Sequence, residues 1–129
     1  MIQRDYFERL TQQVAKVLAR LIGKDWEKIL LAIEQTFDQH LPITRKELLQ
    51  VSLEDFKDWI EEQELSDDQL EAIAMLLQKE GEHIGTVAAQ KDRFERALLL
   101  YEVVERRTDL FSPDRVQRIQ KVKALLSEL

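Results

Sequence analysis

The chain has 129 residues, which suits one domain with a buried core, and its 25 acidic and 19 basic side chains give a net charge of −6. That balance argues against a nucleic-acid-binding protein, which ordinarily carries a basic patch. Cysteine is absent, which excludes disulfides, thiolate nucleophiles and Cys-ligated metal sites. Because no apolar stretch has the length of a signal core or a membrane span, we expect a soluble, cytoplasmic protein without membrane association.

Apolar residues recur at helical spacing throughout, and only three glycines and two prolines interrupt them. We therefore predict an all-α protein with a single domain over residues 1–129. The first predicted helix covers 3–22, and Gly23 can end it in the left-handed conformation. The second begins near Trp26, and so short a connection predicts an antiparallel pair.

Four Ser or Thr residues in the remaining chain stand where a helix can begin. Each follows an apolar residue that can pack on another apolar residue five positions later, as in a capped helix start. These residues are Thr44, Ser52, Ser66 and Ser112. They predict helices over 45–51 and 53–64, one that starts at 67, and one over 113–128.

The helix that starts at 67 either stops at Gly81 or continues to about 90. We favour the long helix, because its apolar face continues past the glycine. On this interpretation Gly81 and Gly85 let a neighbouring helix approach closely. A further helix is predicted over 92–108, with Phe94 on its inner face.

The stretch from Gln78 to Phe111 has small and aromatic residues at the spacing of a helical hairpin. The small residues are Gly85 and Ala97, and the aromatic residues are Phe94 and Tyr101. In this pattern the stretch resembles a degenerate tetratricopeptide repeat, although Gly81, Ala88 and Asp109 replace its usual Trp, Tyr and Pro. Trp26 and Phe94, each near a predicted helix start, lie 68 residues apart, which is twice the repeat period. The resemblance implies an array of antiparallel helical hairpins, here with short irregular central helices.

A second resemblance covers nearly the full length of the chain and is carried by five segments. They are MIQRDYFERLTQQVAKVLARLIG, DWEKILLAIEQ, SLEDFKDWI, LSDDQLEAIAMLLQKEGE and DRFERALLLYE. Together they are similar to a family of small, uncharacterised bacterial proteins with tetratricopeptide-like helices. This similarity implies the same fold and assigns no activity.

The polar residues point to no catalytic, cofactor or metal site. Glu80 and His83 form one E-x-x-H pair, whereas a di-iron bundle needs two, so we interpret His83 as a surface histidine beside a glutamate. Asp67 and Asp68 favour a helix start through their charge. The basic series at Arg115, Arg118, Lys121 and Lys123 is interpreted as a solvated helix face. Trp59 is a candidate interface residue if exposed, and part of a wider buried face otherwise.

The leading hypothesis is a non-enzymatic protein-protein interaction module that binds a protein or peptide partner in the concave groove of its hairpins. The repeat register places Glu82, Thr86 and Gln90 in that groove. The alternative is a self-associating structural homodimer. It would use surplus apolar surface at Leu99, Leu100 and Val103. An enzyme remains a third reading, which would require a polar pocket with converging carboxylates.

Overall fold

The computed structural model describes residues 9–129, and within them the chain forms seven α-helices and no strand. The helices are α1 (Leu10–Ala19), α2 (Trp26–His40), α3 (Arg45–Gln50), α4 (Leu53–Glu62), α5 (Asp67–His83), α6 (Val87–Arg107) and α7 (Pro113–Ser127). The all-α prediction is therefore confirmed. The start of the helix predicted over 3–22 lies outside the described residues, and its end is at Ala19. Gly23 follows with a φ of 80°, the left-handed conformation expected of it.

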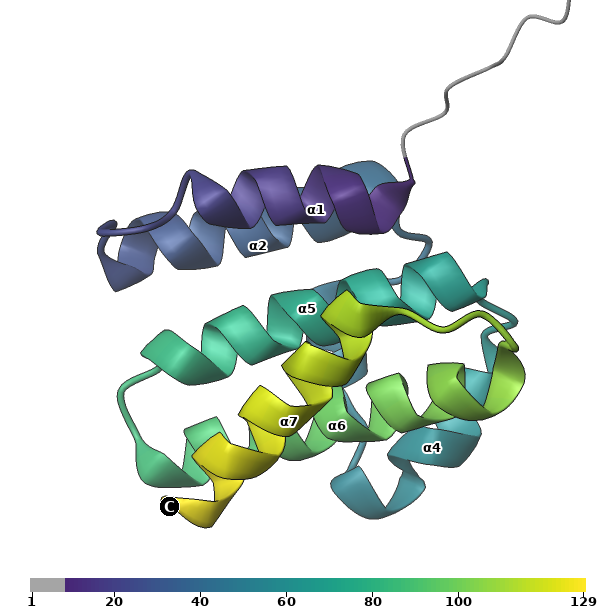
Figure 1. The fold of residues 1–129 in the computed structure, drawn as a ribbon. Coiled ribbons are helices and arrows are strands. Elements are labelled where there is room, and N and C mark those ends of the chain that lie inside the picture. The colour runs from purple at the N-terminus through teal and green to yellow at the C-terminus, as the bar shows by residue number, and fades with distance from the viewer. Residues whose placement is uncertain (1–8) are drawn as a thin grey trace, which may run out of the picture.

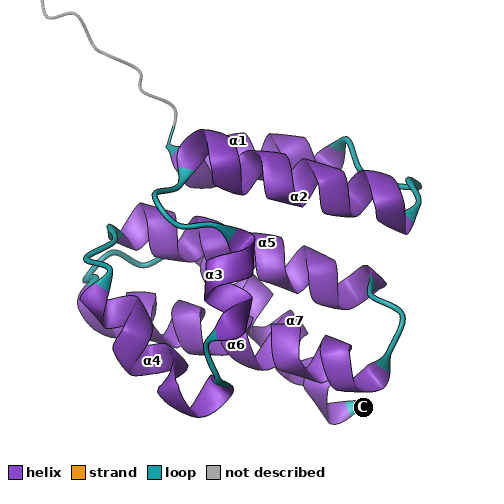
Figure 2. Ribbon diagram, turned by 180° about the vertical axis from the view of Figure 1, so that it is seen from behind, coloured by secondary structure: helices purple, strands orange, loops and turns teal. Residues whose placement is uncertain are grey.

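The helix α5 lies in the middle of the fold (Figure 1). The antiparallel pair α1 and α2 packs along one side of it, and α6 runs antiparallel to it along the other. The last helix, α7, crosses the α5–α6 pair on the face nearest the viewer in Figure 1. The short helices α3 and α4 lie on the opposite face (Figure 2), where α4 packs against α6.

The sequence of α5 explains its central place. Eleven of its 17 residues are buried, including Ile73, Leu76 and Leu77, which are fully enclosed. A helix that is apolar around most of its circumference must be covered on several sides. The predicted close approach holds at Gly81, where a Cβ would come within 2.7 Å of the Phe94 ring.

All four predicted caps are formed. The side chains of Thr44, Ser52, Ser66 and Ser112 each accept a hydrogen bond from the backbone N–H three residues later. One accompanying packing prediction is wrong: Phe111, which should pack beside the Ser112 cap, is 77% exposed.

The favoured continuous helix over 67–90 is wrong. The helix α5 ends at His83, Ile84 is extended, and Thr86 begins α6 by accepting a hydrogen bond from Ala89 N–H at 3.3 Å. Thr86 is thus a fifth Ser/Thr cap that the sequence analysis missed. The close-approach role predicted for Gly85 is also wrong, because a Cβ there would meet no atom within 4 Å.

The same turn overturns the predicted repeat register. The tetratricopeptide pattern over 78–111 needs its first helix to continue past Gly85, where the chain in fact turns. Trp26 opens α2, whereas Phe94 lies in the interior of α6. The 68-residue spacing therefore relates positions that are not equivalent in the two helices.

Candidate functional site

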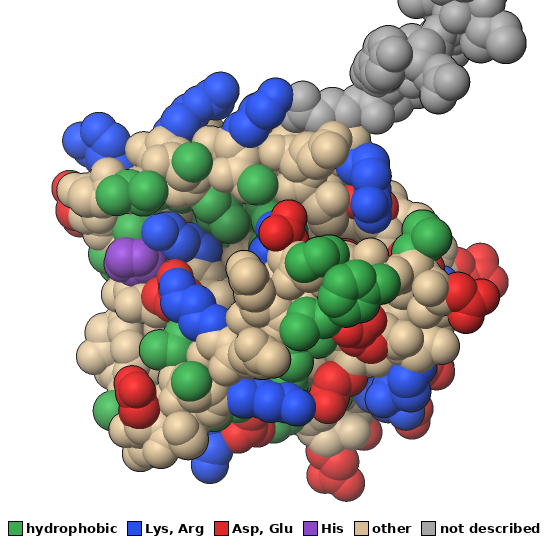
Figure 3. All heavy atoms as spheres, viewed as in Figure 1, with side chains coloured by type: hydrophobic (Ala, Val, Ile, Leu, Met, Phe, Trp, Pro, Cys, Tyr) green, Lys and Arg blue, Asp and Glu red, His purple; other side chains and the backbone are tan. Residues whose placement is uncertain are grey.

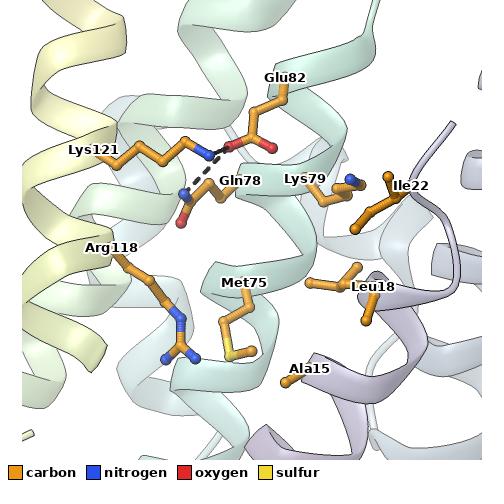
Figure 4. Close-up of a pocket in the computed structure, with 10 residues that line it drawn as sticks. Ala15, Leu18, Ile22, Met75, Gln78, Lys79, Glu82, Arg118 and Lys121 are labelled. Atoms are coloured by element: carbon orange, nitrogen blue, oxygen red, sulfur yellow. Dashed lines mark hydrogen bonds and ion pairs between the residues drawn. The ribbon is translucent and has the colours of Figure 1, made fainter. Parts of the chain in front are cut away.

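A hollow of about 370 Å³ opens between α1, α5 and α7. Its apolar lining comes mainly from α1 and its polar lining from α5 and α7, as Figure 4 shows. The lining residues are Ala15, Leu18, Ala19, Ile22, Met75, Gln78, Lys79, Glu82, Arg118 and Lys121. Ile22, at the rim, is 76% exposed.

Two further hollows continue the first along the seam between α1 and α7. The second shares Ala15 and Arg118 with the first, and the third shares Arg9, Glu71 and Ser112 with the second. We call the three connected hollows the furrow. The exposed Leu110 and Phe111 line its far end.

One stripe of α5 forms the floor of the furrow. Its lining residues Glu71, Met75, Gln78 and Glu82 are three to four positions apart, which places them on a single helical face. From Glu71 to Glu82 this stripe extends about 16 Å at the helical rise of 1.5 Å per residue. The furrow is therefore long enough for about three turns of a helix.

The floor is held rigidly from below. The buried hydroxyl of Tyr101 donates a hydrogen bond of 2.8 Å to Gln78 Oε1, which leaves the amide nitrogen of Gln78 to donate to Glu82 at 3.4 Å. Burial raises the pKa of Tyr101 well above its usual value, so the hydroxyl stays a donor. The orientation of Gln78 in the floor is thus fixed by a residue of α6.

Ion pairs with carboxylates of α5 hold two cationic side chains of the α7 wall in position. Arg118 Nη1 donates to Glu71 Oε2 at 3.0 Å, and Lys121 Nζ lies 3.2 Å from Glu82 Oε2. Lys79 lies beside Ile22, on the side of the hollow opposite Lys121 (Figure 4). Cationic groups therefore stand on both sides of the first hollow.

The basic series of α7 is only in part the solvated face that the sequence suggested: Lys121 and Lys123 are exposed, Arg118 is half-buried, and Arg115 is not on that face. Arg115 is buried and donates hydrogen bonds to Glu71 and Glu105, both at 3.1 Å. Burial alone would lower the pKa of Arg115, but these two carboxylates hold it above its usual value. Arg115 thus anchors α7 to the core, and Arg118, one turn later, lines the furrow.

The two helices that border the furrow are rich in cations. Residues 9–24, which contain α1, carry four cations and no carboxylate, and residues 113–127, which form α7, carry four cations and one carboxylate. Both helices are therefore basic in a chain whose net charge is −6, and the three hollows themselves are lined by five cations and four carboxylates. Figure 3 shows Lys and Arg side chains along α1 and around the hollow below it.

The E-x-x-H pair is divided between core and surface. Glu80 has no exposed surface and accepts hydrogen bonds from Arg45 Nε at 2.6 Å and from Arg93 Nε, whereas His83 lies at the surface as predicted. His83 is exposed, and partial burial together with the nearby Lys79 lowers its pKa. Within residues 9–129 no three His, Asp or Glu side chains are placed to hold a metal ion.

Only one of the three predicted partner-binding residues lines the furrow. Glu82 belongs to α5 and lies in the first hollow. Thr86 caps α6 and Gln90 lies in its first turn, so the turn at 84–86 separates them from Glu82. The predicted groove rested on a continuous helix, which is why its residues do not come together.

The apolar surface expected for a homodimer is used within the chain. Leu100 and Val103 are 0% and 3% exposed, and Leu99 is partly buried against the core. Trp59 is partly buried as well and stacks on Phe56, with ring centroids 6.3 Å apart. The wider buried face is thus the correct interpretation of both stretches.

The residues that sequence reasoning missed are those that α1 and α7 contribute to the furrow. The chief of these are Ala15, Leu18, Ile22, Arg118 and Lys121. The one signal available was charge, because the acid-free stretch from Arg9 to Lys24 is unusual in an acidic chain.

Comparison of the chain with protein-family models, with curated proteins and with solved structures finds no match. In the part of the chain that the structure describes, no helix has the length and apolar character needed to cross a bilayer.

Proposed function

We propose that this protein is a non-enzymatic protein-binding module and that the furrow between α1 and α7 is its binding surface. The observation that carries the proposal is the continuity of three hollows along one face of α5. A surface depression of this length, with apolar side chains along its α1 side, suits a helical or extended segment of a partner protein.

The exposed apolar side chains support the same function. Ile22 lies at one end of the furrow, and Leu110 and Phe111 lie at the other, each more than 70% exposed. Large apolar residues that rim a depression are typical of interaction surfaces. A partner that spanned the furrow would cover all three.

The scaffold proposed here is tetratricopeptide-like in its use of helical hairpins, without a 34-residue register. In such scaffolds the helices of neighbouring hairpins form the walls of a binding groove. The walls would here be α1, from the first hairpin, and α7, with the floor provided by α5 of the hairpin that follows.

A binding role is favoured over an enzymatic one by the way the polar groups of the furrow are used. Glu71 and Glu82 are each neutralised by a cation at 3.0–3.2 Å. Acid–base catalysis needs carboxyl groups with separated pKa values in a closed pocket. Neutralised carboxylates along an open furrow suit recognition instead.

The test compares proteins captured from a lysate of the native host by the unchanged chain and by two Trp variants. Ala15→Trp places an indole in the furrow, whereas Ala124→Trp places one at an exposed position of α7 outside it. We expect partners retained by the unchanged chain and by Ala124→Trp to be lost by Ala15→Trp. Circular dichroism establishes that both variants remain folded.

Two outcomes contradict the proposal. If Ala15→Trp retains the same proteins as the unchanged chain, the furrow is not the binding surface. If the unchanged chain retains no protein above the background of bare resin, the chain is not a binding module.

A further inference from the structure

We propose that the partner segment bound in the furrow is an acidic amphipathic helix, with one apolar stripe flanked on both sides by Asp or Glu. This inference rests on the proposed function and specifies the chemical class of its partner. Three features of the furrow carry it: its length, the arrangement of its apolar and basic groups, and the charge of its walls.

The length and the floor set the shape of the occupant. The stripe from Glu71 to Glu82 accommodates about three helical turns. The apolar groups of the first hollow, chiefly Leu18, Ile22 and Met75, lie together on its α1 side and floor. A helix with apolar residues at i, i+3 or i+4, and i+7 presents a stripe that fits such a surface.

The cations that line the first hollow determine which residues should flank the apolar stripe of the partner helix. Lys79 lies on one side of the first hollow, and Arg118 and Lys121 lie on the other, with Glu82 the one carboxylate in its lining. Within the described residues, no carboxylate lies within 4 Å of Lys79 Nζ, whereas Lys121 already has Glu82. Carboxylates on both flanks of the partner's apolar stripe would meet these cations.

Cations outside the first hollow also favour an acidic partner. Arg20 and Lys24 follow the apolar residues of α1, in a stretch that holds no carboxylate between residues 9 and 24. His83, next to the same end of the furrow, has a pKa lowered by burial and by two lysines. Local positive charge in an otherwise acidic protein attracts an anionic partner.

A peptide fits these features better than a nucleic acid does. Five of the ten side chains that line the first hollow are apolar, namely Ala15, Leu18, Ala19, Ile22 and Met75. Nucleic-acid surfaces instead meet phosphates with dense basic and hydrogen-bonding groups. This apolar side of the hollow requires apolar anchors, which an amphipathic helix supplies.

The test is selection from a displayed library of 16-residue helical peptides. The apolar stripe is fixed and all other positions are randomised among Asp, Glu, Lys, Arg, Gln and Ser. Selection uses the full chain, with Ala15→Trp as the blocked furrow. We expect Asp and Glu to be enriched at least about threefold over Lys and Arg at positions flanking the stripe.

Affinity measurements on one selected acidic peptide supply the matched control. Lys79→Gln combined with Lys121→Gln should weaken its binding by about tenfold, because both flanking cations are lost. Lys28→Gln combined with Lys57→Gln removes the same charge from exposed positions of α2 and α4 and should change the affinity by less than about twofold.

The outcomes separate the two proposals. Selected peptides that bind through the furrow but lack acidic enrichment would overturn the partner class and leave the binding function standing. Peptides that bind Ala15→Trp as well as the unchanged chain, or no selection at all, would contradict both. Displacement of the acidic peptide by duplex DNA at equal concentration would assign the furrow to nucleic acid instead.

Discussion

A single carboxylate joins three helices at the centre of the fold. Glu80 of α5 is fully enclosed and accepts two hydrogen bonds from Arg45, the first residue of α3, and one from Arg93 of α6. The hydrogen bond with the Glu80 carboxylate is the main reason why the pKa of Arg45 is raised. A buried ion pair adds little net stability by itself, but loss of one partner leaves the other charge without compensation.

Glu80→Gln should therefore destabilise the protein strongly. The substitution keeps the side-chain shape but leaves Arg45 and Arg93, whose side chains are only 17% and 14% exposed, without their shared anion. We expect the free energy of unfolding, measured by urea denaturation, to fall by about 3 kcal/mol.

Glu34→Gln is the matched control for that measurement. Glu34 is the second, exposed partner of Arg45, with 3.8 Å between Arg45 Nη1 and Glu34 Oε2. Its loss should change stability by less than about 0.5 kcal/mol. Equal effects of the two substitutions would show that burial of Glu80 does not determine the cost.

The two glycines near the α5–α6 turn should respond oppositely to the same substitution. At Gly81 a new methyl group would meet the Phe94 ring at 2.7 Å, and that ring is buried and has no room to move. Gly81→Ala should lower the free energy of unfolding by about 1–2 kcal/mol, because overpacking outweighs the gain in helix propensity.

At Gly85 the space around the new methyl group is open and the backbone is not left-handed. Gly85→Ala should leave the free energy of unfolding unchanged or raise it by about 0.5 kcal/mol, because it restricts the unfolded chain. Thermal unfolding of both variants checks the pair, and a stabilising Gly81→Ala would contradict the close packing of Phe94.

At the scale of elements, α1 depends on a residue of another helix for its start. Leu10 N–H and Thr11 N–H, which have no partner within their own helix, donate to Asp68 of α5 at 2.7 Å and 3.1 Å. The two acidic residues predicted to favour the start of α5 therefore have a second role. Asp68 satisfies the N-terminus of α1 and fixes that wall of the furrow against its floor.

Asp68→Ala should loosen α1 selectively. We expect about 1–2 kcal/mol of stability to be lost, with faster amide hydrogen exchange concentrated in the first two turns of α1. Asp58→Ala, at an exposed position of α4, should have an effect below about 0.5 kcal/mol. Exchange that accelerates equally in α1 and α2 would show that Asp68 does not cap α1.

Local chemistry explains which elements could be predicted from the sequence. A Ser or Thr cap acts on an amide three residues away, so the starts at Thr44, Ser52, Ser66 and Ser112 are visible in the sequence alone. The turn at Thr86 has the same chemistry, but the apolar face continued past it and favoured one long helix. The extended backbone of Ile84 ends that helix, and Val87 and Ala88, which follow the turn, are exposed.

At the scale of the whole molecule, the candidate site could not be predicted because its parts are distant in the sequence. The furrow combines Leu18, Met75 and Lys121, which come from three helices and lie side by side only after folding. A periodicity shows which face of a helix is apolar, but not which helix covers it. The predicted site therefore followed the repeat register, and of its three residues only Glu82 lines the furrow.

The burial pattern also determines how the molecule should open. In α5 eleven residues are buried, whereas α7 buries only Arg115 and Val122 among its 15 residues. Segments with few buried contacts open at a lower free energy than the global transition, and their amides exchange earlier. The floor of the furrow should therefore be the most protected element, and its α7 wall should be among the least protected.

Native-state hydrogen exchange tests this difference directly. Amides in the middle of α5 should exchange only through global unfolding, so their opening free energy should equal that from urea denaturation. Amides of α7 should open at least about 1 kcal/mol below that value. If α7 were as protected as α5, both would belong to one cooperative unit, and the furrow would be a rigid cleft whose α7 wall cannot adjust to a bound helix.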